Sequence, residues 1–389
     1  GETSGSWWRL WGLANGLKAL LGAVREELVG HIRTWAALLL TTVLALPAWA
    51  GEPLAFQDLG PLRIRDQFLL GMGLLAFDPE SADVLADGRW QVDLIATLTN
   101  TFAKSNAITD RLEQRSGRET VTREFLRSAA GAQATHNAFY LDGETLRTAL
   151  AIRRGFGHRI QLGVTLQALN FSGGFLDSTI EGFHDTFGLG QAGRRGAPRK
   201  QYAVFVSSGG HEFFSEHEPS SGFGDTVLSG KYAITEQPGH AYLSVEALVK
   251  IPTGRETDLY SSGSTDVGVQ ALYSRFWAKS CLHASVGVLR NGPGRTLQTP
   301  SQTVASGVVA YEHGIFNTRT SAIAQVTVSQ SPFRDLHLAE LGQLSLQTSL
   351  GIKCAFGPSR VLFVAVTENL VHFDNTADVG FHVGWTQRL

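Results

Sequence analysis

The sequence is poor in charged residues and in long apolar segments, and each shortage excludes a class of protein. Asp, Glu, Lys and Arg make up 17% of the 389 residues, against about 25% in soluble proteins. The 33 basic and 35 acidic residues nearly cancel, so there is no basic surface that would bind nucleic acid. After residue 50 no apolar run approaches the roughly 20 residues of a membrane-spanning helix, which excludes a helical membrane protein.

Cysteine is also scarce, whereas glycine is abundant. Cys281 and Cys354 are the two cysteines of the chain, too few for a disulfide framework, and their pairing cannot be read from the sequence. The 43 glycines are spread evenly, which helices resist and strand-and-turn proteins accept. No cofactor motif is present.

Methionine occurs once, at Met72, and the chain does not begin with it. We interpret residues 1–30 as an over-extended start, in which a non-standard start codon at Leu28 or Val29 is read literally. The alternative is an amphipathic segment that precedes an export signal. Both interpretations leave residues 1–30 outside the fold.

Residues 31–50 have the three parts of a secretory signal peptide. A weakly basic start is followed by the apolar run 35–46, which is short for a membrane helix. Ala48 and Ala50 form a small-x-small cleavage pattern, so cutting after Ala50 leaves Gly51 as the new N-terminus. The alternative is a transmembrane anchor.

Beyond the signal, the hydrophobic period is two. In "QLGVTLQAL" at 161–169, Leu162, Val164 and Leu166 alternate with Gln161, Thr165 and Gln167, which in a strand gives one apolar and one polar face. The pattern predicts twelve strands, at about 89–101, 143–154, 158–169, 221–234, 239–252, 264–277, 280–291, 302–314, 319–330, 343–355, 359–371 and 378–389.

The lengths of the connections alternate too. Short joints such as "GFGH", "EQPG" and "FGPS" follow every second strand, and the others are longer, with 102–142 and 170–220 the longest. Alternating short and long connections are typical of bacterial outer-membrane barrels, whose short turns face the periplasm. We therefore predict an all-β fold: a transmembrane antiparallel β-barrel of about 12 strands at 89–389, with long extracellular loops, an extracellular insert at 170–220, a short loop helix and both termini in the periplasm.

Aromatic residues gather near the short turns, as in the interfacial girdle of a membrane barrel. We expect this girdle to contain Phe156, Tyr232, Tyr242, Phe276, Trp277, Phe316, Phe356 and Trp385.

Several stretches resemble a family of Gram-negative envelope proteins known as a domain of unknown function. They are "GPLRIRDQF" at 60–68, "FSGGFLDSTIEGFHDTFGL" at 171–189, "GFGDTVLSGKY" at 222–232, "KIPTG" at 250–254 with "SSGSTD" at 261–266, and "TENL" at 367–370. The order Gly-x-Gly-Asp, Pro-Thr-Gly, Ser-Gly-x-x-Asp is also similar to outer-membrane proteins of aromatic-degradation meta-pathways, for which transport is assumed. The resemblance implies an outer-membrane barrel and supplies no site residues. "RDQF" departs from the "RNQ" expected at 65–67.

If the apolar face of each strand meets lipid, charged residues on the other face line the lumen. Both signs are present, so the charges either pair across the lumen and seal it or line a narrow polar path. The lumen-lining residues are predicted to be Asp93, Arg147, Arg153, Lys231, Glu246, Lys250 and Glu368.

The segment 51–88, which precedes the first strand, contains the apolar run "FLLGMGLLAF". Such a run is too apolar to be free in the periplasm. We interpret the segment as a periplasmic or plug segment lodged in the barrel mouth, and the alternative is a docking face for a periplasmic partner.

Two groups of polar residues are candidate sites. Asp177, Glu181 and His184 share one face of a helix and could ligate a metal, but three ligands on one helix favour a solvated polar face. Ser207, Ser208, His211 and His217 offer a nucleophile and a base. No Gly-x-Ser-x-Gly elbow or His-Glu-x-x-His motif accompanies them, so we assign no catalytic or metal residues.

The sequence thus indicates a passive outer-membrane channel for small or partly apolar solutes. The alternatives are a lipid-active enzyme and a structural or adhesive envelope protein. The expected partners are outer-membrane lipid, the barrel-assembly machinery and an unidentified small solute, with no cofactor and no nucleic acid.

We expect protein isolated from the outer membrane to begin at Gly51, because Ala48 and Ala50 fit the signal peptidase. N-terminal sequencing checks this. Retention of residues 31–50 would contradict the signal peptide and favour an anchor.

Overall fold

The structure, a computed structural model, describes residues 60–389 apart from 132–136, 189, 218–220, 237–239 and 370–373. The described residues belong to one compact unit, Ala50–Leu389. The expected start, signal peptide and cleavage site therefore lie outside the described residues. Within the described ranges, no helix is long and apolar enough to cross a membrane.

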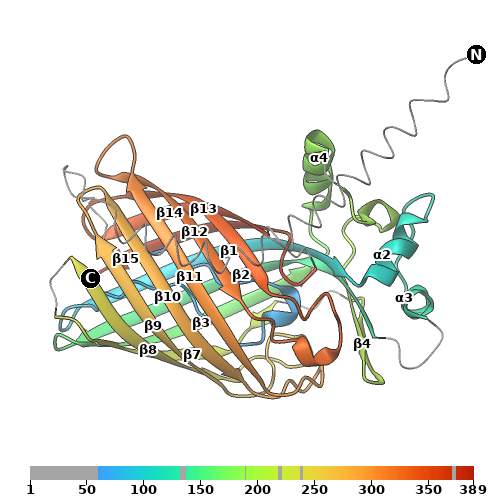
Figure 1. The fold of residues 1–389 in the computed structure, drawn as a ribbon, viewed down its shortest axis with the longest axis horizontal. Coiled ribbons are helices and arrows are strands. Elements are labelled where there is room, and N and C mark those ends of the chain that lie inside the picture. The colour runs from blue at the N-terminus through green and yellow to red at the C-terminus, as the bar shows by residue number, and fades with distance from the viewer. Residues whose placement is uncertain (1–59, 132–136, 189, 218–220, 237–239, 370–373) are drawn as a thin grey trace, which may run out of the picture. The chain divides into compact units, whose positions relative to one another are not determined.

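Twelve antiparallel strands form a closed barrel (Figure 1), as predicted. They pair in chain order, and the barrel closes because β1 pairs with both β2 and β15. The strands are β1 (Trp90–Lys104), β2 (Ala138–Phe156), β3 (Ile160–Ser172), β7 (Thr226–Ala233), β8 (Ala241–Ile251), β9 (Asp266–Phe276), β10 (Ser280–Asn291), β11 (Gln302–Gly314), β12 (Thr320–Ser329), β13 (Ser345–Ala355), β14 (Arg360–Asn369) and β15 (Val379–Arg388).

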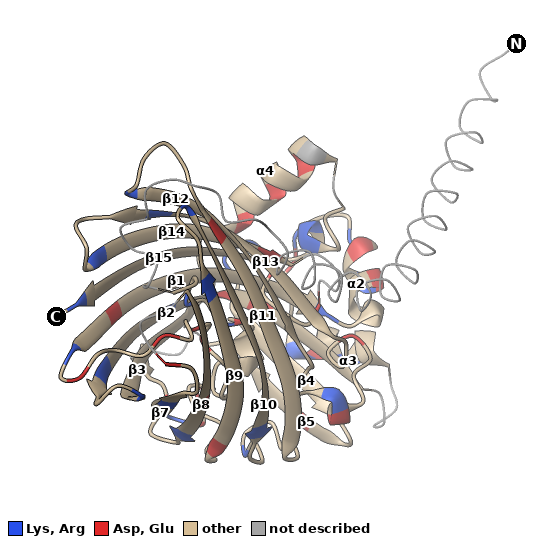
Figure 2. Cartoon of the chain, turned by 60° about the vertical axis from the view of Figure 1, so that its left-hand side comes forward, with Lys and Arg blue, Asp and Glu red and all other residues tan. Residues whose placement is uncertain are grey.

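The period of two explains the two faces of the wall. Along β8 exposed and buried residues alternate at every position, since successive side chains of a strand point to opposite faces. Most outward side chains are apolar, as in Leu94, Leu162, Val269 and Leu350. Figure 2 shows strands that carry few charged residues over most of their length. The outer face is therefore that of a transmembrane barrel.

Connections alternate in length as expected. Short turns join β2 to β3, β9 to β10 and β13 to β14, whereas the connections from β1 to β2 and from β3 to β7 are long. The first and last strands meet at the short-turn end, where the Trp90 amide donates to the Leu389 carbonyl at 3.1 Å.

The long connections build a second layer of structure at their end of the barrel. The helices α2 (Asn106–Glu113) and α3 (Arg123–Ala130) and the hairpin of β4 (Ala203–Ser208) and β5 (His211–Ser215) lie there, and β4 extends the sheet beside the first residues of β2. These four elements were not predicted. The predicted loop helix is present as α4 (Asp177–Phe187). Two-residue β6 (Gly222–Phe223) and the 3₁₀ turns η2 (Leu69–Gly71), η3 (Arg194–Gly196) and η4 (Arg334–Leu336) complete the elements.

An apolar cluster holds this layer to the wall, and ion pairs join the elements of the layer to one another. Phe102, Leu112, Leu126 and Tyr140 are buried together between α2, α3, β1 and β2. Glu212 on β5 binds arginines of α3. The hydrogen bond from Arg127, joined by one from Arg123, lowers the pKa of Glu212 from its ordinary value and outweighs its partial burial.

The expected aromatic girdle is correct only in part. Phe156, Tyr232, Phe316 and Phe356 are exposed near the short turns, and Trp385 is half-buried. Three other members are buried, because Tyr242 and Phe276 occupy inward positions of β8 and β9 and Trp277 lies in the turn after them. Tyr242 and Phe276 instead contact each other, with ring centroids 5.4 Å apart.

Candidate functional site in the barrel interior

Residues 60–88, which we call the inner segment, run through the barrel interior and back. Near its beginning the Gly60 carbonyl accepts a hydrogen bond from Lys353 of β13 at 2.7 Å. Its middle forms η2 at the long-connection end, seen in blue in Figure 1. Near its end the Leu85 amide donates to Gln161 of β3 at 3.1 Å, beside the short turns. The segment therefore spans the length of the interior twice without adding a strand to the sheet.

Glu80 is the centre of an ionic cluster between the inner segment and the wall. It accepts two hydrogen bonds from Arg63, at 2.8 and 2.6 Å. Arg153 of β2 and Lys231 of β7 approach its carboxylate to 3.2 and 3.3 Å. Asp93 of β1 balances the cations by pairing with Arg153 and by accepting from Thr386 at 2.6 Å. Each member of this buried cluster has an opposite charge beside it.

Lys250 of β8 is the centre of a second cluster, which joins the motifs "GFGD", "KIPTG" and "SSGSTD". Its Nζ lies 2.7 Å from Asp225, 3.1 Å from Asp266 and 2.7 Å from the Ser262 hydroxyl. It also donates to the Gly73 carbonyl of the inner segment at 2.6 Å. Asp225 comes from "GFGD", and Ser262 and Asp266 come from "SSGSTD". Three of the motifs that carry the family resemblance thus converge on one ammonium group, which holds the turn of the inner segment.

The same motifs bind the inner segment through the backbone. The Leu75 amide donates to Asp266 at 2.9 Å, and the Gly254 amide of "KIPTG" donates to Asp225 at 2.9 Å. A Cβ atom on Gly73 would lie 2.7 Å from the Ser261 carbonyl carbon. Glycine is therefore required at position 73 for the close approach of the two backbones.

The first motif, at 60–68, is part of the inner segment and stabilises the turn of that segment. Arg65 donates to the Gly71 and Leu74 carbonyls at 3.0 Å each. Asp66 accepts from the Phe68 amide at 3.0 Å and from Thr376 at 2.9 Å. The acidic side chain that departs from the expected motif thus accepts from three donors, the third being Gln347 at 3.4 Å.

Apolar contacts fill the space between the ionic clusters. Phe77 faces Gly268 of β9 and Gly287 of β10, whose added Cβ atoms would lie 3.3 and 2.6 Å from its ring. Leu69 and Met72 are fully buried at the long-connection end. Small wall residues therefore make room for large residues of the inner segment.

Six of the seven charged residues predicted to face the lumen are buried at inward positions. Arg147 donates to Gln167 at 2.9 Å and lies 3.6 Å from Asp78. Glu246 accepts from Gln270 at 2.7 Å. The others, Asp93, Arg153, Lys231 and Lys250, have the contacts given above.

The prediction for Glu368 is wrong in direction. Glu368 is exposed on the outward face of β14, on the same side as Val364 and Val366. Its strand is apolar on both faces, so the period of two could not assign the side.

The sequence reasoning missed the partners that the inner segment and the motifs supply. Arg63 and Glu80 lie in a segment whose strongest sequence signal is its apolar run, and this signal hides their pairing. Asp225 and Asp266 belong to sequence motifs, but the motifs give no indication that these carboxylates bind Lys250. A signal was present, since buried charges require partners of opposite sign and the lumen lysines had none assigned.

The helix-borne group Asp177, Glu181 and His184 does not form a common site. Asp177 pairs with Arg194 at 3.0 Å, Glu181 binds Arg118 and Arg199 at 2.6 Å each, and His184 lies 3.0 Å from the Gly190 carbonyl. Asp177 and Glu181 are buried. They hold the long connections together, which is neither a metal site nor a solvated face.

The serines and histidines of 207–217 belong to the β4–β5 hairpin and the residues after it. Ser208 is opposite His211 in the register, but its hydroxyl donates to the Leu336 carbonyl. Ser207 is opposite Glu212. His217 lines a separate cavity of about 220 Å³ with Tyr202, Phe213, Ser215, Thr257, Asp258 and Leu259.

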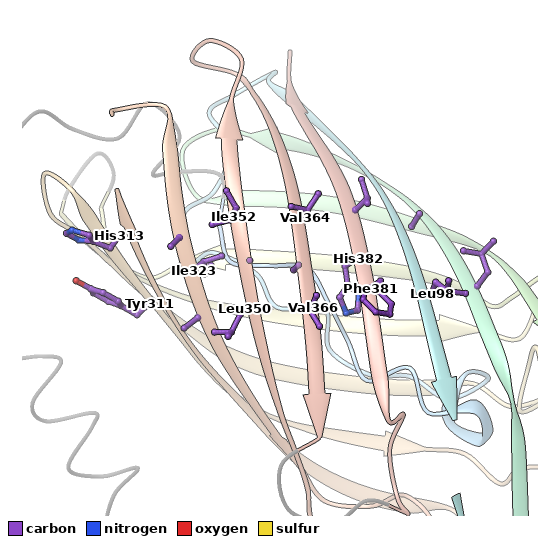
Figure 3. A pocket seen from close by; sticks show the side chains of 17 residues that line it. Leu98, Tyr311, His313, Ile323, Leu350, Ile352, Val364, Val366, Phe381 and His382 are labelled. Carbon is purple, nitrogen blue, oxygen red and sulfur yellow. The ribbon is translucent and has the colours of Figure 1, made fainter. Parts of the chain in front are cut away.

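A larger cavity of about 880 Å³ lies on the outer wall. Figure 3 shows Leu350, Val366 and Phe381 on neighbouring strands at this cavity, with Tyr311 and His313 at one end. Leu350, Val366 and Phe381 are exposed on the outward face. This hollow therefore faces the lipid side of the barrel and is separate from the interior.

We expect Glu80→Gln to destabilise the barrel by about 3–5 kcal/mol, because it leaves Arg63, Arg153 and Lys231 buried around a neutral amide. The free energy of unfolding, from urea titration of lipid-embedded protein, measures the effect. Glu236→Gln is the control, since Glu236 is 92% exposed and pairs with Arg159 at 3.5 Å. Equal stability of the two variants would contradict the ionic cluster.

Comparisons with solved structures give distant likenesses. An outer-membrane channel from Pseudomonas putida F1 is 12% identical, with a TM-score of 0.47 over 81% of this chain and 100% of that chain. The NanC porin is 10% identical, with a TM-score of 0.39 over 77% and 100%. The P. putida toluene transporter TodX is 12% identical, with a TM-score of 0.35 over 78% and 89%. Likenesses this distant assign no function.

No curated protein sequence matches the chain at a significant level. A family model does match, over residues 34–389, and its description is "Protein of unknown function (DUF3187)". The match includes every motif on which the resemblance was based. The chain therefore belongs to this family of unknown function.

Proposed function

We propose that the protein is an outer-membrane barrel that acts as a passive channel for small or partly apolar solutes, with the inner segment as its plug. The observation that carries the proposal is that the inner segment fills the interior without joining the sheet. Side-chain contacts such as Lys250 to Gly73 and Arg153 to Glu80 hold it there. Water and solutes can replace such side-chain contacts, so the inner segment can leave the interior. A strand of the wall cannot leave, because it is part of the closed sheet.

The apolar outer face supports the location. A continuous apolar band stabilises a barrel in lipid and would be a liability in water. Among bacterial membranes, barrels of this kind belong to the outer membrane, where the barrel-assembly machinery inserts them. The alternation of connection lengths supports an orientation in which α2, α3 and α4 are outside the cell and the short turns are in the periplasm.

The interior supports a path for small polar or partly apolar solutes. Without the inner segment, Arg147, Arg153 and Lys231 would line the lumen together with Asp93 and Glu246. Charges of both signs in a narrow space favour small neutral or zwitterionic solutes over one sign of ion. At the outer end, the cavity that includes His217 is lined by aromatic and polar side chains and has the volume for a small molecule.

A structural or adhesive envelope protein is the second candidate. A fully occupied interior favours this structural role, because a barrel that transports nothing needs no open path for solutes. The lipid-active enzyme has less support, since Ser208 is bonded to a backbone carbonyl and not to a histidine.

Conductance in planar bilayers tests the channel. We expect low conductance from the intact protein, a large increase on deleting residues 60–88, and a smaller increase with Glu80→Gln, which loosens the cluster without removing the segment. Glu236→Gln at an exposed turn should conduct like the intact protein. Heat-modifiable migration on gels confirms that each variant is folded.

Two results would contradict the proposal in different ways. Porin-like conductance of the intact protein would exclude the plug. A deletion variant that folds and inserts but shows no conductance would exclude the channel and favour the structural role.

A further inference from the structure

We propose that Cys281, His283 and Glu312 form a binding site for a divalent metal ion of the zinc class. One ligand atom from each residue lies within 4.8 Å of the other two. All three residues are buried, with exposed fractions of 0%, 1% and 0%. The site is separate from the clusters around Glu80 and Lys250 and does not depend on the proposed channel.

The sheet itself places the three side chains together. Cys281 and His283 are two residues apart on β10, so both point inward. Glu312 of β11 is directly opposite Cys281 in the register, and the Cys281 Sγ lies 3.6 Å from a Glu312 oxygen. Because these positions lie in paired strands, the geometry is rigid before any ion arrives.

The hydrogen bonding of His283 gives independent evidence that this site binds an ion. Its Nε2 is buried and has no hydrogen-bond partner among the described residues, which is rare for a polar atom at such depth. Its Nδ1 lies 2.8 Å from the Ser274 hydroxyl. A neutral imidazole with one nitrogen bonded and the other open has the form of a metal-binding histidine.

The hydrogen bonds of Ser274 accommodate the tautomer that a metal requires. Its hydroxyl accepts from the Ala82 amide at 2.9 Å and lies 3.2 Å from the Ser81 hydroxyl. A serine hydroxyl donates once and accepts twice. With the proton of the hydroxyl donated to Ser81, Ser274 accepts from Nδ1–H of His283, and the lone pair of Nε2 is left for a metal.

The donor set selects the class of ion. One sulfur, one nitrogen and one carboxylate oxygen suit zinc and similar transition metals, whereas calcium and magnesium take oxygen ligands. On binding, a bond forms between the metal and the Cys281 sulfur, and the thiol proton leaves to solvent or buffer. Lys353, which lies 2.7 Å from Glu312, then shares that carboxylate with the ion.

Access is from the short-turn end. Cys281 is the second residue of β10, and Glu312 is two residues before the end of β11. Both are next to short turns, so the site lies at the periplasmic end of the barrel in the proposed orientation.

Cobalt titration of the full chain folded in detergent tests the site. We expect one Co²⁺ per chain, a sulfur-to-cobalt charge-transfer band in the near ultraviolet, and loss of the band when Zn²⁺ is added. Cys281→Ser should abolish the band. Cys354→Ser is the matched control, because Cys354 lies on the outward face of β13, and it should leave the band unchanged.

A second variant separates coordination from folding. Ser274→Ala removes the hydroxyl that orients His283, and we expect Co²⁺ affinity to fall about 10–100-fold with the band retained. If Cys281→Ser does not fold, His283→Gln must show the loss of the band. Absence of the band in the wild-type protein, its persistence in Cys281→Ser or His283→Gln, or its loss in Cys354→Ser would overturn the proposal.

Discussion

The width of a twelve-stranded barrel is the constraint on which the rest of the structure depends. About eight strands enclose a space that wall side chains can fill, whereas larger barrels leave a lumen. Here residues 60–88 occupy that lumen. A segment with polar backbone groups in a dry interior needs partners for each of them, and the inward polar and charged side chains of the wall supply many of these partners. Lys250 bound to the Gly73 carbonyl and Gln161 bound to the Leu85 amide are examples.

This constraint gives the sequence motifs a physical role. "GFGD", "KIPTG" and "SSGSTD" are far apart along the chain, yet they bring Asp225, Lys250 and Asp266 to one point. "RIRDQF" supplies Arg63 for Glu80 and Arg65 for the turn. The motifs are therefore explained by the fit between the inner segment and the wall, without reference to a substrate. Two carboxylates around one ammonium also explain why Lys250 tolerates full burial.

The barrel was predictable from the sequence because lipid and lumen impose a strict period of two. Outward positions such as Leu162 and Val269 must be apolar, and the alternation follows. The period of two could not assign a face to residues of a strand that is apolar on both faces. β14 is apolar on both faces, so Glu368 was assigned to the wrong side. Tyr242 has the same parity as Glu246, and this signal would have placed its ring inside.

Elements outside the membrane could not be predicted in the same way. The helices α2 and α3 and the β4–β5 hairpin are held by local contacts such as Arg127 to Glu212, which leave no long period in the sequence. The partners in the interior were hidden for another reason. Glu80 and Lys231 are 151 residues apart along the chain, and a single sequence does not pair such distant charges.

A disulfide cross-link between the inner segment and the wall tests the central claim most directly. Ala82 and Ser274 are close, with 2.9 Å between the Ala82 nitrogen and the Ser274 hydroxyl. The pair Ala82→Cys and Ser274→Cys, in a chain that has Cys281→Ser and Cys354→Ser, should form a disulfide within one chain under mild oxidation in outer membranes. Each single variant should not. If the double variant folds and inserts but forms no cross-link, residues 60–88 do not occupy the interior, and the account of a filled barrel is wrong.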